Sequence, residues 1–252
     1  GQNFLTDEET LASIVRAADV AGENVLEIGA GAGCLTKELA ARAKRVMAVE
    51  IDSALIPVLQ TVLFPQKNVR VIHGDALKLD LKSLTEEYFD GEPFVVAANL
   101  PYSITTPILF RLLEEDLPAK RMCLMLQKEA VGRVIARPGA KEYGPLAILC
   151  AYRAEASAVL TAAPHCFYPQ PHVESTVILL RLRPHGAKVD QPAFLRFVKA
   201  CFLMRRKTLL NNLLALGLAR QDAEEALIQA GISPGARAET LSLDTFLNLY
   251  QI

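Results

Sequence analysis

Val25-Leu-Glu-Ile-Gly-Ala-Gly-Ala-Gly33 is the stretch of sequence that decides the fold. An apolar run suited to a strand leads directly into three glycines at alternate positions, and a helical pattern follows. Glycines at such a turn let the backbone pass close to a ligand where a Cβ atom would collide. The spacing is G-x-G-x-G and not the G-x-G-x-x-G of dinucleotide-binding folds, so this run alone is a weak sign of a nucleotide site.

Short apolar, β-branched segments alternate with helical patterns through the first half of the chain. We predict strands at residues 25–28, 45–51, 69–73, 94–97 and 122–126, and helices at 35–43 and 53–63. Nearly continuous apolar runs are typical of parallel strands that are covered on both faces. The alternation therefore predicts an α/β protein with a doubly wound, mostly parallel sheet.

Farther along the chain, two more strands are predicted, at 156–161 and 176–183. A proline-rich loop at 164–171 joins them, and its prolines make it stiff. Arg181 and Arg183 alternate with leucines, which is the pattern of an edge strand or of a half-exposed one.

Only helical patterns remain beyond residue 190, at 192–203, 207–216, 222–230 and 244–250. Gly217 and Gly231 stand where helices end, and Ser242 can cap the last helix. We therefore predict a larger domain at residues 1–186 and a small all-helical domain at 187–252.

The composition excludes several classes of protein. No run of apolar residues approaches the roughly 18 that a membrane helix needs, so no membrane association is expected. The five cysteines and four histidines show neither a C-x-x-C pair nor metal-ligand spacing. We expect reduced thiols, no metal site and a cytoplasmic protein.

The formal net charge of −1 conceals basic residues gathered in two segments. The first holds Lys120, Arg121, Lys128, Arg133, Arg137 and Lys141, and the second holds Arg196, Lys199, Arg205, Arg206, Lys207 and Arg220. Segregated basic segments in a near-neutral chain can present one face to a polyanion. A solvated helix surface explains either segment alone equally well.

Two carboxylates stand at the ends of the second and third predicted strands. Glu50 can accept hydrogen bonds from both hydroxyls of a ribose. Asp75, within His73-Gly-Asp-Ala76, can accept from the amino group of adenine, or it can simply cap a turn. Because the carboxyl ends of parallel strands converge on one crevice, these residues and the glycine turn predict a ligand that contains adenosine.

Asn99-Leu-Pro-Tyr102 follows the fourth predicted strand. The N6 nitrogen of adenine is a poor nucleophile because its lone pair is delocalised into the ring. The Asn99 side-chain carbonyl and the Leu100 backbone carbonyl can accept both N6 hydrogens, with Pro101 biasing Leu100 towards an extended conformation. Tyr102 offers an aromatic face to the base. With N6 in line with a sulfonium methyl, orientation and charge stabilisation would suffice. N-x-P clusters also occur in ordinary loops, so position in the sheet gives this motif its weight.

The proline-rich loop contains Phe167-Tyr-Pro-Gln-Pro171. Aromatic side chains between rigid prolines can stack on a base that is turned out of its surroundings. The alternative is that the aromatic side chains cap the core.

Together, these motifs resemble the small-subunit ribosomal RNA adenine N6,N6-dimethyltransferases, a family of class I, Rossmann-like methyltransferases that use S-adenosylmethionine. The matching residues are Gly1-Gln-Asn-Phe-Leu5, Glu27-Ile-Gly-Ala-Gly-Ala-Gly33, Glu50, Gly74-Asp75, Asn99-Leu-Pro-Tyr102, Gln127-Lys-Glu129, Tyr143-Gly-Pro-Leu146, Phe167 through Ser175, Arg205-Arg-Lys-Thr-Leu209 and Asn211-Asn212. Several individually loose motifs in one order, over nearly the whole chain, make the match specific.

The resemblance implies transfer of methyl groups from S-adenosylmethionine to two adjacent adenosines in a hairpin loop near the 3′ end of small-subunit rRNA. S-adenosylhomocysteine is then the product, the pre-ribosomal small subunit is the partner, and ribosome biogenesis is the setting. We expect a monomer without a metal. The implied cofactor-binding residues are Asn3, Leu5, Gly29, Gly31, Glu50, Ile51, Asp75, Ala76 and Asn99. The implied catalytic residues are Asn99, Leu100, Pro101, Tyr102 and Phe167, and the implied RNA-binding residues are Lys128, Arg133, Arg205, Arg206 and Lys207.

Two departures and three alternatives accompany the resemblance. His172 stands where the family usually has lysine, and the net charge is less basic than expected. Antibiotic-resistance methyltransferases of large-subunit rRNA share several motifs, but Arg205-Arg-Lys-Thr favours the small-subunit family. A non-catalytic RNA-binding or ribosome-assembly factor on the same scaffold would not need an intact Asn99-Leu-Pro-Tyr102. A dinucleotide oxidoreductase explains the glycine turn but neither later motif.

Overall fold

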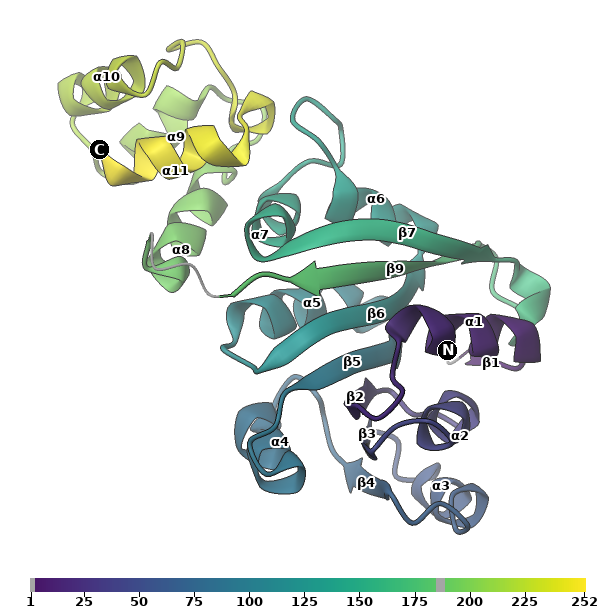
Figure 1. The fold of residues 1–252 in the computed structure, drawn as a ribbon. Coiled ribbons are helices and arrows are strands. Elements are labelled where there is room, and N and C mark those ends of the chain that lie inside the picture. The colour runs from purple at the N-terminus through teal and green to yellow at the C-terminus, as the bar shows by residue number, and fades with distance from the viewer. Residues whose placement is uncertain (1–2, 185–188) are drawn as a thin grey trace. The chain divides into compact units, whose positions relative to one another are not determined.

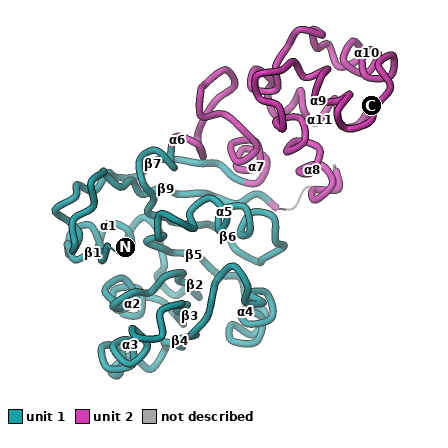
Figure 2. The backbone as a smooth tube through the Cα atoms, turned by 180° about the vertical axis from the view of Figure 1, so that it is seen from behind, with its two compact units in different colours: residues 1–131, 154–183 teal, residues 132–153, 184–252 magenta. Residues whose placement is uncertain are grey.

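The structure is a computed structural model, and it describes residues 3–184 and 189–252 (Figure 1). The first two residues of the Gly1-to-Leu5 motif and the predicted domain boundary at 186/187 lie outside these ranges. The chain divides into two compact units, one of Gly1–Val131 with Ala154–Arg183 and one of Gly132–Arg153 with Pro184–Ile252 (Figure 2).

A seven-stranded sheet forms the centre of the first unit. Its order is β4 (Val69–His73), β3 (Arg45–Glu50), β2 (Asn24–Ile28), β5 (Phe94–Asn99), β6 (Ala119–Gln127), β9 (Ser175–Leu182) and β7 (Ala154–Ala162). The strands from β2 to β6 are parallel, whereas β9 is antiparallel to both of its neighbours. The doubly wound, mostly parallel sheet is therefore confirmed. The strand order reverses between β2 and β5, and ligands bind at such switch points in open α/β sheets.

Helices cover both faces of this sheet (Figure 1). The helices of the first unit are α1 (Glu8–Ala18), α2 (Cys34–Ala40), α3 (Ile56–Val62), α4 (Leu81–Phe89), α5 (Thr105–Glu114) and the start of α6 (Lys128–Ile135). Side chains of α1 and α2 pack with Val25, Val46, Val95 and Val177 in one buried cluster. These valines lie on one side of their strands because successive side chains point to opposite faces. Burial on both faces explains why the strands are nearly continuous apolar runs.

The strand that contains Arg181, β9, is not the edge strand that its sequence pattern allowed. β9 lies between β6 and β7, so β7 is the edge strand. Residues 175–180 are buried and only the end of β9, at Arg181, is exposed. The alternation of arginine and leucine therefore lies where the buried strand reaches the protein surface.

A two-stranded pair joins the N-terminal segment to the proline-rich loop. β1 (Phe4–Leu5) is antiparallel to β8 (Phe167–Tyr168), with Leu5 opposite Phe167. Neither strand was predicted, because two residues carry no periodicity that could indicate a strand.

The second unit is helical. It contains the end of α6, α7 (Pro145–Arg153), α8 (Gln191–Cys201), α9 (Leu209–Ala215), α10 (Arg220–Gln229), η3 (Ala238–Thr240) and α11 (Leu243–Gln251). Tyr143 and Ile148 are buried in its core with Phe194 and Phe246, and the Tyr143 hydroxyl donates to the Leu241 carbonyl over 2.8 Å. Residues 132–153, which we had placed in the first domain, therefore pack within the helical unit. No helix of the described chain is long and apolar enough to cross a membrane.

Candidate active site

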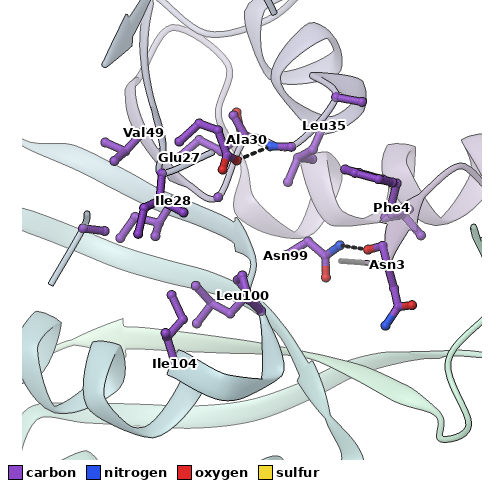
Figure 3. Close-up of a pocket in the computed structure, with 18 of the residues that line it drawn as sticks. Asn3, Phe4, Glu27, Ile28, Ala30, Leu35, Val49, Asn99, Leu100 and Ile104 are labelled. Atoms are coloured by element: carbon purple, nitrogen blue, oxygen red, sulfur yellow. Dashed lines mark hydrogen bonds between the residues drawn. The ribbon is translucent and has the colours of Figure 1, made fainter. Parts of the chain in front are cut away.

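A cavity of about 320 Å³ opens at the carboxyl edge of the sheet, within the first unit (Figure 3). The C-terminal ends of β2, β3 and β5, the loop after β4 and the N-terminal segment form its walls. Every residue predicted to bind the cofactor lines it, namely Asn3, Leu5, Gly29, Gly31, Glu50, Ile51, Asp75, Ala76 and Asn99. Leu100, Pro101 and Tyr102 line it as well. A cavity of this size can hold a nucleoside-sized ligand.

The glycine turn allows two other segments to close onto it. Gly29 and Gly31 have φ values of 76° and 57°, in the left-handed region that favours glycine. A Cβ atom on Gly31 would lie 3.2 Å from the ring of Phe4, and one on Gly29 would lie 3.4 Å from Cδ of Pro101. The glycines therefore allow Phe4 and Pro101 to pack close to the turn, and they also allow the turn its left-handed backbone.

Glu50 fixes the shape of this turn. Its Oε2 accepts a hydrogen bond from the Gly31 N–H over 2.7 Å, and its Oε1 accepts one from the Asp52 N–H over 2.8 Å. The side chain is only 2 % exposed. A carboxylate oxygen can accept more than one hydrogen bond, so both oxygens keep capacity for the hydroxyls of a ribose.

Glu27 is a second carboxyl group that lines the cavity, and no pattern in the sequence assigns it a role of its own. It is 1 % exposed, and its Oε2 finds no hydrogen-bond partner among the described residues. Burial raises the pKa of Glu27 to about 8, and the nearby charge of Glu50 also raises it, while Thr36 opposes the shift. Glu27 is therefore mainly protonated at neutral pH.

Asp75 takes part in a turn and also lines the cavity, so its role towards adenine stays a prediction. Its Oδ1 accepts from the Leu77 N–H over 2.9 Å, and its backbone carbonyl accepts from Lys78 and Leu79. Asp75 thus closes a turn between β4 and α4. The same residue lines the cavity beside Ala76.

Asn99 presents an oriented amide at the rim of the cavity (Figure 3). Its Nδ2 donates to the backbone carbonyl of Asn3 over 3.4 Å. Because a carbonyl can only accept, the amide nitrogen must face Asn3, and Oδ1 points the other way. The next N–H, that of Leu100, donates to the Met125 carbonyl over 3.2 Å and ties the loop to β6. Within the described chain, neither Oδ1 of Asn99 nor the Leu100 carbonyl receives a hydrogen bond.

Tyr102 and Phe167 differ in their surroundings. Tyr102 begins the short helix η1 (Tyr102–Ile104), and its hydroxyl lies 3.3 Å from that of Ser175. Phe167 does not line the cavity; it is 3 % exposed and packs in the core cluster with Leu5 and Leu11. The neighbouring Tyr168 is exposed instead. The base-stacking role of Phe167 stays a prediction that would require its ring to turn outward.

The first basic segment does not form one patch. Lys120 and Arg121 lie near the amino end of β6, away from the cavity edge, and both pair with Glu23. Lys128 follows the carboxyl end of β6 and pairs with Glu174 over 2.8 Å, and this hydrogen bond raises the pKa of the lysine. Arg133 lies farther along α6.

The residues of the second basic segment differ among themselves. Arg205 donates to the Lys141 carbonyl and pairs with Glu239 over 3.1 Å, so it fastens segments of the helical unit together. Arg206 and Lys207 are exposed. Among residues 3–184 and 189–252, no group of three His, Cys, Asp or Glu side chains could hold a metal ion.

A parallel sheet with a cavity at its switch point, a ribose-suited carboxylate on β3 and an Asn-Leu-Pro-Tyr loop after β5 define a class I methyltransferase. The chain belongs to the ribosomal RNA adenine dimethylase family, whose model matches residues 1–252.

Curated relatives and solved structures agree with this membership. Proteins named ribosomal RNA small subunit methyltransferase A, from Geobacillus thermodenitrificans and Bacillus mycoides, are 46% and 45% identical, each over 99% of this chain and 88% of the relative. A dimethyladenosine transferase from Plasmodium falciparum is 26% identical with a TM-score of 0.82, over 98% of this chain and 95% of that one. The 23S rRNA methyltransferase ErmE is 30% identical with a TM-score of 0.71, over 99% and 98%.

Proposed function

We propose that this protein transfers methyl groups from S-adenosylmethionine to N6 of two adjacent adenosines in a hairpin loop near the 3′ end of small-subunit rRNA. The observation that carries the proposal is the oriented amide of Asn99, whose Oδ1 is unoccupied by any described residue beside an adenosine-sized cavity. Family membership supports the same reaction.

The residues around the cavity fit the cofactor. Glu50 would accept from the ribose hydroxyls, and Asp75 with the backbone of Ala76 would bind the adenine ring, beside Ile51. The remaining cofactor residues, Asn3, Leu5, Gly29, Gly31 and Asn99, would surround the methionine end. When bound, S-adenosylmethionine supplies an electrophilic methyl group on a sulfonium.

The Asn99–Tyr102 loop would prepare the target base. Oδ1 of Asn99 and the carbonyl of Leu100 accept the two N6 hydrogens, which localises the N6 lone pair towards the methyl group. Pro101 keeps the loop in shape, and Tyr102 supports the base. Methyl transfer would form a C–N bond at N6 as the sulfonium C–S bond breaks, and one N6 proton would be released to solvent. Alignment and electrostatic stabilisation account for the acceleration without a strong general base.

The choice of small-subunit rRNA is supported by the relatives. Those at 46% and 45% identity are named as small-subunit enzymes, whereas the large-subunit enzyme ErmE is at 30%. We propose the first unit as the catalytic domain and the helical unit as the RNA-binding domain, so that residues 132–153 join residues 187–252 and not the expected domain of 1–186. Exposed Arg206 and Lys207 would be its primary phosphate contacts, with Arg205 as their support. Lys128 and Arg133 would add contacts from α6. The protein would be a cytoplasmic monomer, and its partner would be the pre-ribosomal small subunit.

Methylation of isolated ribosomal particles tests the proposal. The protein is incubated with S-adenosylmethionine labelled in the methyl group and with small or large subunits that lack the modification. We expect N6,N6-dimethyladenosine in small-subunit rRNA, at two adjacent positions when mapped by primer extension. Label confined to large-subunit rRNA would favour the antibiotic-resistance activity, and binding without label would favour an assembly factor.

A further inference from the structure

Arg111, on α5, binds the backbone of the loop that follows β4. Its Nη1 donates to the Ala76 carbonyl over 2.5 Å, and its Nη2 donates to the Leu79 carbonyl. The remaining donor, Nε, pairs with Glu115 over 2.5 Å. The side chain is only 16 % exposed, so this network lies largely away from water.

The loop that Arg111 holds is the loop that lines one wall of the cavity. Gly74, Asp75 and Ala76 all line it. The loop folds back tightly, since a Cβ atom on Gly74 would lie 2.9 Å from the Leu79 side chain. One guanidinium therefore fixes two carbonyl groups of a single turn, and a planar fork of donors suits that geometry.

The amino end of α5 connects to the Asn99–Tyr102 loop. η1 runs directly into α5, and the Pro101 carbonyl accepts from both Ile104 N–H and Thr105 Oγ1. Arg111 thus lies on the same rigid helix that begins at the proposed target-base loop. Its hydrogen bonds connect this helix to the wall that carries Asp75.

We infer that Arg111 is a positioning residue that fixes the turn at residues 75–79 and thereby shapes the site for the adenine ring of the cofactor. This inference rests on the proposed function, because it assigns that wall to the adenine ring. Arg111 does not itself line the cavity and therefore acts through the backbone of the turn.

The chain offers a matched control in Arg121. Its Nε donates to the Ala18 carbonyl over 2.7 Å and its Nη2 to the Asp19 carbonyl, and its side chain is 17 % exposed. Arg121 therefore binds two backbone carbonyls at the end of α1, as Arg111 binds two in the turn. The difference is location, since Arg121 lies near the amino end of β6 and not at the cavity.

The test compares Arg111→Met and Arg121→Met with the wild-type protein, using S-adenosylhomocysteine as the probe. Titration calorimetry without RNA measures its Kd, urea unfolding measures stability, and hydrogen exchange reports on the amides of residues 75–79. We expect Arg111→Met to raise the Kd at least tenfold and to speed exchange in the turn. Arg121→Met should change the Kd less than twofold, even with a similar loss of stability. If Arg111→Met does not fold, Arg111→Lys serves, because one ammonium cannot reproduce the fork.

Three outcomes would count against the inference. An unchanged Kd for a folded Arg111 variant overturns this inference and leaves the proposed function intact. Equal weakening by Arg121→Met shows that Arg111 acts through general stability and overturns it as well. Failure of the wild-type protein to bind S-adenosylhomocysteine overturns the proposed function, and this inference falls with it.

Discussion

The hydroxyl of Tyr102 lies 3.3 Å from the hydroxyl of Ser175, the first residue of β9. Ser175 is fully buried and is paired in the sheet with Gln127 on one side and Ala162 on the other. The last residue of the Asn99–Tyr102 motif is therefore hydrogen-bonded to the residue that ends the Phe167-to-Ser175 motif. Two motifs that are far apart in the chain meet at one hydrogen bond.

Removing this hydrogen bond should slow methyl transfer while leaving cofactor binding intact. Such a bond is worth about 1 kcal/mol, so we expect Ser175→Ala to lower the single-turnover rate by about fivefold. Tyr102→Phe should have a similar effect on the rate. The double variant should be little worse than either single one, because both substitutions remove the same interaction. Fully additive losses would show that the two side chains act independently.

Glu50→Ala should weaken cofactor binding. The substitution removes the acceptor proposed for the ribose and leaves the N–H groups of Gly31 and Asp52 without their partner. We expect the Kd for S-adenosylmethionine to rise at least tenfold, which is about 1.4 kcal/mol, in titration calorimetry. Gln60→Ala on α3 serves as a control, because its side chain is exposed and does not line the cavity. Unchanged affinity in Glu50→Ala would exclude the ribose assignment.

Glu27→Gln should alter how stability depends on pH. The pKa of Glu27 is about 8 in the folded protein and near 4.5 when unfolded, so the folded state binds the proton more tightly. The stability that this group contributes is complete below pH 4.5 and is lost as the pH rises towards 8. The loss approaches about 1.4 kcal/mol per pH unit at most.

Glutamine stays neutral, so this decline should be absent from the variant. Urea unfolding of the cofactor-free protein between pH 5 and pH 8 provides the measurement. The stability of Glu27→Gln relative to the wild-type protein should increase steadily over that range. Parallel pH profiles for the two proteins would contradict a neutral, buried Glu27.

In the helical unit, the exposed residues Arg206 and Lys207 should affect RNA binding, whereas Arg205 should affect stability. Arg206→Ala with Lys207→Ala should weaken RNA binding and lower the salt slope of the binding constant by about 1.5, because each phosphate contact contributes about 0.7 to 0.9. Arg205→Ala should mainly lower stability, since Arg205 is bonded to Glu239 and to the Lys141 carbonyl. Filter binding at several salt concentrations and thermal unfolding measure the two effects. A salt slope that does not move in the Arg206 and Lys207 variant would rule out their phosphate contacts.

The sheet and the cavity residues at its strand ends were predictable because their signals are local, whereas Asn3 and Leu5 were expected only from the family resemblance. Apolar runs flanked by turn residues marked the strands; the glycine turn directly follows β2, and Glu50 and Asn99 are the last residues of β3 and β5. Strand ends that share one edge of a parallel sheet must meet, so these residues needed no further information.

The parts that were missed depend on contacts between distant segments. Tyr143 and Ile148 belong to the helical unit because their side chains are buried there, and no local pattern records that choice. Phe167 could stack on a base or cap the core as far as the sequence shows, and its burial accompanies the pairing of β8 with β1. Helix α1, which was not predicted, does carry a local signal, since Asp7 caps its first turn.

Methyl transfer by Asn99→Ala tests the central claim most directly. Single-turnover rates are measured on unmethylated small subunits at saturating S-adenosylmethionine, with the formation of N6-methylated adenosine followed by nucleoside analysis and folding checked by thermal unfolding. We predict a fall of at least about a hundredfold in a protein that remains folded and is saturated with the cofactor, because the oriented acceptor for N6 is lost. A rate close to that of the wild-type protein would contradict the account.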